Sequence, residues 1–181
     1  VQRVVIVGAG IAGVSAAEAI RDDKSNATVT LLSDEAHLPY SRMNLTRYLA
    51  GEVSLDKLDL HPRSWYQENQ IDLYLNSPVT ELDPKQKIVR LADGREFAYD
   101  TLLLTNGAHP FVPPITGAQT PGVQTLRTLE DANAILAAAA QPINVVCIGG
   151  GLLGLEVAGA ISRRGAKVTV VESLAWLLPR Q

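Results

Sequence analysis

Two stretches of the chain share one pattern of apolar and polar positions. Residues 4–7 form a continuous β-branched run that ends at a glycine, and apolar residues then recur at helical spacing as far as Ile20. A second apolar run follows at residues 28–32. This pattern predicts a strand, a tight turn, a helix and a second strand. A unit of this length joins two parallel strands through a right-handed crossover.

The middle of the chain has a different pattern of apolar and polar residues. Short helices are predicted at residues 44–49 and, after Pro62, at 63–69, followed by a strand at 72–75. Short apolar runs separated by polar turns then predict a small antiparallel meander over 79–99 and a return strand at 101–105. The proline-rich segment 109–114 predicts a stiff connector. We therefore place a domain boundary here, between a first domain at 1–112 and a second at 113–181.

Beyond the connector the first pattern returns. After a predicted helix at 130–140 come a strand at 144–148, a helix at 152–164 and a strand at 167–171. Residues 4–13 align with residues 145–154 without a gap. This internal repeat predicts an α/β fold with two Rossmann-like domains, the first of which carries the meander. The second copy has only two strands and the chain begins without methionine, so we expect a piece of a longer protein.

Each copy places a G-x-G-x-x-G motif between its first strand and its helix. In such a motif the first glycine permits the turn, the second lets a pyrophosphate approach the backbone, and the third lets the helix pack closely. The phosphates then lie at a helix N-terminus, where free N–H groups stabilise negative charge. The glycines concerned are Gly8, Gly10 and Gly13 in the first copy and Gly149, Gly151 and Gly154 in the second. Two motifs in register predict two dinucleotide sites.

An acid at the end of the second strand of such a unit accepts hydrogen bonds from a ribose. The candidates are Asp34 and Glu35 in the first copy and Glu172 in the second. A carboxylate at Glu172 would repel a 2′-phosphate, so NADH is favoured over NADPH. The alternative interpretation is an acid at a strand end that only faces water.

Composition and charge exclude several other classes of protein. The chain has 16 Lys and Arg against 19 Asp and Glu, a net charge of −3, which argues against a nucleic-acid surface. No apolar run reaches the roughly 18 residues of a membrane span. The single cysteine, Cys147, cannot form a redox pair and indicates a cytoplasmic protein. The three histidines are scattered, so no metal site is expected.

Two dinucleotide sites on one chain imply two cofactors, and FAD with NADH is the economical pair. Along its whole length the sequence resembles the FAD-dependent pyridine nucleotide-disulfide oxidoreductase superfamily. The resemblance is carried by the two glycine motifs and by residues 38–42, 102–108, 126–132 and 154–156. Residues 41–49 contain no cysteine, so the chain is most similar to the thiol-free branch. That branch contains ferredoxin and rubredoxin reductases and the flavin module of NADH-dependent assimilatory nitrite reductase large subunits.

The resemblance implies a role for each matching residue. The FAD pyrophosphate and ribose are assigned to Gly8, Gly10, Ala12, Gly13 and Asp34, with Glu35 as a second acid. Other parts of FAD are assigned to Arg42, Arg47, Val79, Thr105, Gly107 and Arg127. NAD(P)H is assigned to Gly149, Gly151, Gly154, Glu156 and Glu172. Arg47 and Glu156 are expected at the reaction site, as an ion pair near the flavin; a surface arginine on a polar helix is the other interpretation of Arg47.

The expected function is an FAD-dependent NAD(P)H oxidoreductase. It passes electrons from NADH through flavin to a partner protein or domain of the iron–sulfur, rubredoxin or siroheme type. We expect no nucleic-acid or membrane partner, and a possible homodimer of the full-length protein. Two alternatives stay open, a dinucleotide-binding sensor without turnover and a flavin monooxygenase.

Overall fold

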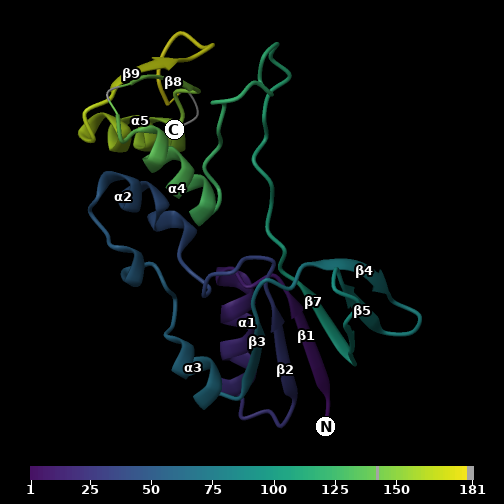
Figure 1. The fold of residues 1–181 in the computed structure, drawn as a ribbon. Coiled ribbons are helices and arrows are strands. Elements are labelled where there is room, and N and C mark those ends of the chain that lie inside the picture. The colour runs from purple at the N-terminus through teal and green to yellow at the C-terminus, as the bar shows by residue number, and fades with distance from the viewer. Residues whose placement is uncertain (142, 179–181) are drawn as a thin grey trace. The chain divides into compact units, whose positions relative to one another are not determined.

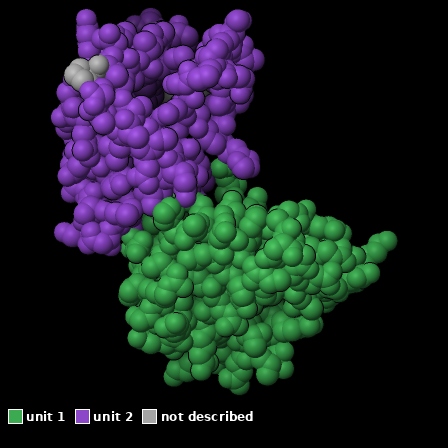
Figure 2. Space-filling view, in the orientation of Figure 1, with its two compact units in different colours: residues 1–41, 59–108 green, residues 42–58, 109–181 purple. Residues whose placement is uncertain are grey.

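The computed structural model describes residues 1–141 and 143–178 and divides the chain into two compact units. The first unit consists of residues 1–41 and 59–108, and the second of residues 42–58 and 109–181 (Figure 2). Each unit has its own sheet and its own Rossmann-type crossover helix (Figure 1). The predicted α/β class, with parallel strands and an antiparallel meander, is therefore confirmed.

The first unit is built on a four-stranded parallel sheet in the order β3-β2-β1-β7. Its strands are β1 (Arg3–Val7), β2 (Thr28–Leu32), β3 (Ile71–Tyr74) and β7 (Thr101–Leu104). Helix α1 (Ile11–Asp22) joins β1 to β2, and the short helix α3 (Arg63–Glu68) precedes β3. Val4 and Ile6 of β1 pack with Val14 and Ala17 of α1 in one buried cluster. The alternate residue, Val5, points to the opposite face, as the period of a strand requires.

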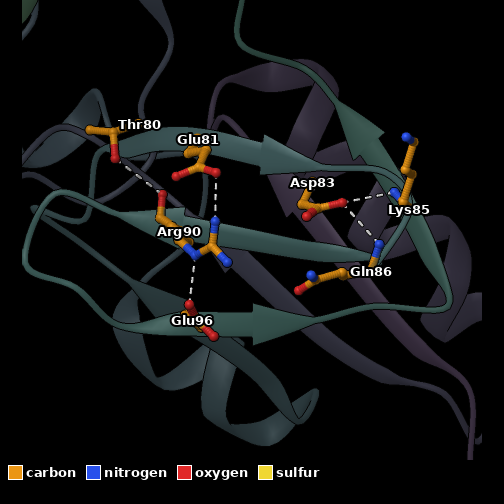
Figure 3. A network of polar contacts seen from close by, with 7 residues as sticks. All are labelled: Thr80, Glu81, Asp83, Lys85, Gln86, Arg90 and Glu96. Carbon is orange, nitrogen blue, oxygen red and sulfur yellow. Dashed lines mark hydrogen bonds and ion pairs between the residues drawn. The ribbon is translucent and has the colours of Figure 1, made fainter.

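That opposite face is covered by the meander. Strands β4 (Val79–Asp83), β5 (Ile88–Leu91) and β6 (Glu96–Ala98) pair antiparallel, and Val89 and Leu91 pack against Val5. Figure 3 shows the polar contacts of the meander, where Arg90 lies between Glu81 and Glu96 at 2.5 and 2.6 Å. Ion pairs this exposed contribute little to stability, so burial on the apolar face holds the meander in place.

The second unit contains a two-stranded parallel sheet of β8 (Asn144–Ile148) and β9 (Lys167–Val171). Helix α5 (Leu152–Arg163) connects the two strands, and α4 (Leu129–Ala138) precedes them. Thr128 and Asp131 form a capping box that starts α4. Strands β2, β8 and β9 have the bounds that the sequence predicts.

The second unit also contains residues from the first half of the sequence. The 3-10 turns η1 (Arg42–Asn44) and η2 (Leu55–Lys57) flank helix α2 (Leu45–Ala50), and all three belong to it. The connection from β2 to β3 thus gives α2 to the second unit and α3 to the first. The predicted domains, 1–112 and 113–181, differ from the compact units in this segment and at residues 109–112, and their boundary stays a prediction. Among the described residues, no helix has the length and hydropathy of a membrane span.

Candidate dinucleotide-binding sites

The two glycine loops have the same backbone conformation. The first glycine of each has a positive φ, +104° at Gly8 and +108° at Gly149. Their N–H groups donate to the last residue of the neighbouring strand, to Leu32 O at 2.9 Å and to Val171 O at 2.8 Å. Each loop therefore turns out of its first strand while staying bonded to its second.

The third glycine of each loop is required by close packing. A Cβ added to Gly13 would lie 2.0 Å from Gly8 O, and one added to Gly154 would lie 2.1 Å from Gly149 O. Since both obstructing atoms are backbone, neither can move aside without opening the loop. Both copies therefore fit the role predicted for the third glycine, which is to let the helix pack closely against the turn.

The second glycine of each loop faces open space. Gly10 and Gly151 are the N-cap residues of α1 and α5, and neither helix has a side-chain cap. A Cβ at either position would meet no atom within 4 Å. The first N–H groups of each helix are thus uncapped, and the space next to the N-cap glycine is open. A pyrophosphate fits this arrangement.

The first loop is supported by the residue that follows β7. The Thr105 hydroxyl lies 2.7 Å from Gly8 O and 3.0 Å from Val7 O, within hydrogen-bonding distance of both. A Cβ at Gly8 would lie 2.3 Å from the carbonyl oxygen of Thr105. Thr105 was expected against the cofactor, and the structure shows it holding the loop. Gly107, two residues on, is exposed and has a φ of +70°.

The acids at the end of β2 differ in accessibility. Asp34 is exposed, whereas the Glu35 carboxylate accepts a hydrogen bond from the Tyr40 hydroxyl at 2.6 Å. The residue directly after β2, in the position that Glu172 takes after β9, is the buried Ser33. Ser33 was not among the predicted site residues, although its place directly after the strand identifies it. Asp34 is therefore the accessible acid of the first loop, one position beyond the counterpart of Glu172.

Two further residues assigned to FAD lie in this unit. Ala12 is exposed in the first turn of α1, beside the loop. Val79 is half-buried and its side chain packs in the cluster of Val5, Leu32 and Val89. The part of Val79 that is not packed in this cluster stays accessible.

The second loop is supported by the chain that follows β9. The Glu172 carboxylate accepts hydrogen bonds from Leu174 N–H at 2.9 Å and from Gly150 N–H at 2.7 Å. These backbone donors lower the pKa of Glu172, so its negative charge is held beside the loop. Leu178 N–H donates to Gly150 O at 2.9 Å. Residues 172–178 thus fold over Gly150, which lies between the first and second glycines of the motif, and leave Gly151 open.

Cys147 contributes to the same loop from inside β8. Its Sγ donates to Gly154 O at 3.2 Å, and burial raises the pKa of the thiol. A thiol with a raised pKa is a poor nucleophile, so Cys147 acts as a small packing residue. The described residues contain no group of His, Cys, Asp and Glu that could hold a metal ion.

The two residues expected at the reaction site do not pair with each other. Arg47 Nε lies 3.4 Å from Glu52 Oε2, and Glu156 Oε2 instead accepts a hydrogen bond from Thr46 Oγ1 at 3.0 Å. Both contacts lie within the second unit. The predicted Arg47–Glu156 pair is therefore wrong for this structure, because Glu52, just beyond α2, is the nearer acid. Thr46 was not among the predicted site residues, because no sequence motif marks it.

The residues assigned to FAD are divided between the two units. Arg42, Arg47 and Arg127 belong to the second unit, together with all residues assigned to NADH. Arg42 Nη1 donates to Arg127 O at 3.0 Å, which ties η1 to the segment before α4. The remaining residues assigned to FAD lie in the first unit.

The pair of dinucleotide-type loops defines the class of protein, and comparison with known sequences agrees with it. The model of the pyridine nucleotide-disulphide oxidoreductase family matches residues 2–181. The chain belongs to this family.

Its relatives include electron-transfer reductases. An NAD(P)H nitrite reductase of Bacillus subtilis (strain 168) is 38% identical over 181 residues, which are 99% of this chain and 22% of that protein. A rubredoxin-NAD(+) reductase of Pseudomonas putida is 38% identical over 178 residues, 98% of this chain and 46% of that protein. The chain thus spans less than half of the length of either relative.

A solved structure has the same fold. The covalent complex of putidaredoxin reductase with putidaredoxin matches with a TM-score of 0.88 and 34% identity. The match covers 99% of this chain and 44% of that chain. The resemblance stated from the sequence motifs is therefore confirmed.

Proposed function

We propose that the chain is the dinucleotide-binding part of an FAD-dependent NAD(P)H oxidoreductase that passes electrons from NADH to a redox partner. The observation that carries this proposal is the duplicated glycine loop, with the second glycine open in both copies. One such loop would serve a dehydrogenase with a single cofactor. Two loops on one chain suit an enzyme that takes electrons from one dinucleotide onto another.

FAD is assigned to the first unit. Gly8, Gly10 and Gly13 form the cradle for its pyrophosphate, Ala12 lies in the first turn behind them, and the exposed Asp34 is the acid for its ribose. When bound, FAD supplies the redox chemistry, because its flavin can accept a hydride and release electrons singly. The task of the chain is to bind and orient the two dinucleotides and to keep water from the reacting rings.

NADH is assigned to the second unit. Gly149, Gly151 and Gly154 form the cradle, and the charged Glu172 lies against it. Three donors from the chain occupy part of the Glu172 carboxylate, and its remaining lone pairs are available to ribose hydroxyls. A 2′-phosphate in their place would meet a negative charge that the loop itself keeps ionised, which supports NADH over NADPH.

The redox partner is proposed from the relatives. The rubredoxin-NAD(+) reductase and the reductase bound to putidaredoxin support a small electron-carrier protein or domain as acceptor. The nitrite reductase relative supports a siroheme-type acceptor as the other possibility within the same class. A cytoplasmic location and a homodimer are further parts of this proposal.

The test is the flavin absorption of the protein, purified in its natural length, before and after anaerobic addition of NADH. We expect a flavin spectrum that NADH bleaches within the dead time of manual mixing, and reoxidation by an added electron carrier. A sensor would bind the flavin without bleaching. A monooxygenase would consume oxygen in step with an organic substrate and would need no carrier.

A further inference from the structure

Among the described residues, Thr46 is the only one in α2 whose side chain forms a hydrogen bond with a side chain of α5. It is a buried polar residue, 8% exposed. Its hydroxyl donates to Glu156 Oε2 at 3.0 Å, across 110 residues of sequence. Glu156 itself is exposed in the second turn of α5, close behind the open glycine loop. The exposed side chain of Glu156 is thus held by one short, buried side chain, that of Thr46.

Helix α2 is fixed well enough for Thr46 to act as a rigid donor. The Tyr48 hydroxyl donates to Asn133 Oδ1 of α4 at 2.9 Å, and Arg164 Nε donates to Leu49 O at 2.8 Å. Thr46 is also β-branched, and such side chains have few rotamers in a helix. The position of the Thr46 hydroxyl therefore follows from the docking of α2 on α4 and α5.

The partner of Glu156 is neutral, although an arginine follows Thr46 in the sequence. Arg47 contacts Glu52, and Arg163 of α5 pairs with the same Glu52 carboxylate. Glu52 thus faces two guanidinium groups, whereas Glu156 faces a hydroxyl. A hydroxyl fixes the direction of a carboxylate without cancelling its charge, which an ion pair with Arg47 would do.

We propose that Thr46 is a positioning residue that holds the uncompensated negative charge of Glu156 on the nicotinamide side of the second site, so that the site binds NAD⁺ in preference to NADH. This rests on the proposed function, which assigns NADH to the second unit, and on the sequence resemblance, which implies that Glu156 lies near the nicotinamide. The ring of NAD⁺ carries a positive charge and the ring of NADH carries none. A fixed carboxylate therefore stabilises the oxidised ring and favours loss of the hydride.

The experiment compares the dissociation constants of NAD⁺ and NADH for four variants of the natural-length protein, with the tetrahydro analogue of NADH, which has an uncharged ring but transfers no hydride, in place of NADH. In Glu156→Gln we expect the ratio of Kd for NAD⁺ to Kd for this analogue to rise about fivefold, since one partly exposed charge interaction is lost. In Thr46→Val the carboxylate stays but loses its anchor, and we expect about a twofold to threefold rise. Thr46→Ser restores the hydroxyl and should restore the ratio. Glu68→Gln removes a charge from α3 in the first unit, away from α2 and Glu156, and its ratio should match the wild type.

A second measurement needs no dinucleotide. In a double-mutant cycle of thermal unfolding, Thr46→Val and Glu156→Gln should be non-additive, because both remove the same hydrogen bond. Additive shifts would overturn the proposal, as would a ratio of dissociation constants that Thr46→Val leaves at the wild-type value. A wild type that binds neither NAD⁺ nor NADH, with a non-additive cycle, would instead overturn the proposed function and leave the Thr46–Glu156 contact standing as a structural bond only.

Discussion

The two glycine loops have the same shape, but different parts of the chain support them. The first is held from the side by a neighbouring strand, through Thr105 after β7. The second is held by the chain that follows β9, through Glu172 and Leu178. The motif therefore determines the turn, and the surroundings determine how firmly the turn is held.

The two units also share a way of attaching a short helix. At the end of α1, the Arg21 guanidinium donates to the carbonyls of Asn69 and Gln70 after α3, each at 2.7 Å, and to Ala27 O at 2.8 Å. At the end of α5, Arg164 donates to Leu49 O at 2.8 Å. In both units a crossover helix ends near an arginine that satisfies the free carbonyls of a short helix from the β2–β3 connection. The first attachment has more bonds and should be the stronger.

The largest difference between the units is expected for alanine at the first glycine of each loop. Alanine at Gly149 meets an unfavourable positive φ but no neighbouring atom, a cost of about 1–2 kcal/mol. Alanine at Gly8 adds a collision with the Thr105 backbone, so we expect about 4 kcal/mol or more in the 181-residue chain. Hydrogen exchange of the β1 and β8 amides measures the two units separately. Equal losses of unfolding free energy in Gly8→Ala and Gly149→Ala would show that Thr105 does not support the first loop.

A smaller difference is expected for the two arginines. Arg21→Ala leaves several backbone carbonyls without their donor and should lower the free energy of unfolding of the first unit by about 2–4 kcal/mol. Arg164→Ala should cost the second unit about 1 kcal/mol, because its side chain is exposed and donates to fewer carbonyls. Chemical denaturation followed by the same exchange probes gives both values. A larger loss for Arg164→Ala would contradict the comparison.

Most of the fold could be predicted from the sequence because its signals are local. The strands at 28–32, 144–148 and 167–171 are short runs rich in β-branched residues, each followed by a polar residue or a glycine, and the structure gives them the same bounds. The glycine spacing likewise fixes both loops, since the clash of a Cβ with the first glycine's carbonyl involves residues only five apart. Such features need no knowledge of distant contacts.

The rest depends on contacts that sequence spacing does not reveal. The placement of 42–58 with the second unit follows from bonds such as Tyr48 to Asn133, 85 residues apart. The partner of Arg47 depends on which of two acids lies nearer in space. The support of the first loop by Thr105 also becomes visible only when β7 is placed beside β1. These contacts form between residues far apart in the sequence only once the helices and strands have packed together.

Glu172 has no acidic counterpart directly after β2, which predicts a difference in nucleotide preference rather than in stability. Glu172→Gln keeps the shape of the side chain and removes its charge. We expect the preference for NADH over NADPH to fall about tenfold, because the repulsion of a 2′-phosphate is lost. The ratio of Kd for the two nucleotides is the measurement, with Glu68→Gln on α3 as the control for loss of a distant charge. An unchanged ratio would mean that Glu172 only faces water.

The smallest expected effect is the pH dependence of the second loop. The pKa of Glu172 is lowered by the N–H groups of Leu174 and Gly150. Its contribution to the folded state is therefore present above the pKa of an ordinary glutamate, about 4.3, and is lost as pH falls through the lower folded value. Exchange of the Gly150 amide should rise with acid beyond its intrinsic rate, and Glu172→Gln should remove this extra rise. The Gly8 amide, which donates to a carbonyl, serves as the internal reference.

The central claim is that each glycine loop holds its own dinucleotide, and alanine at the second glycine tests it most directly. A methyl group at Gly10 or Gly151 enters open space, so each variant should lose no more than about 1 kcal/mol of its free energy of unfolding, the cost of alanine at an N-cap. We predict that Gly10→Ala loses FAD at least about tenfold more readily while binding NADH normally, and that Gly151→Ala does the reverse. Variants that retain both dinucleotides at wild-type affinity, or that lose both together, would contradict the assignment of one dinucleotide to each loop.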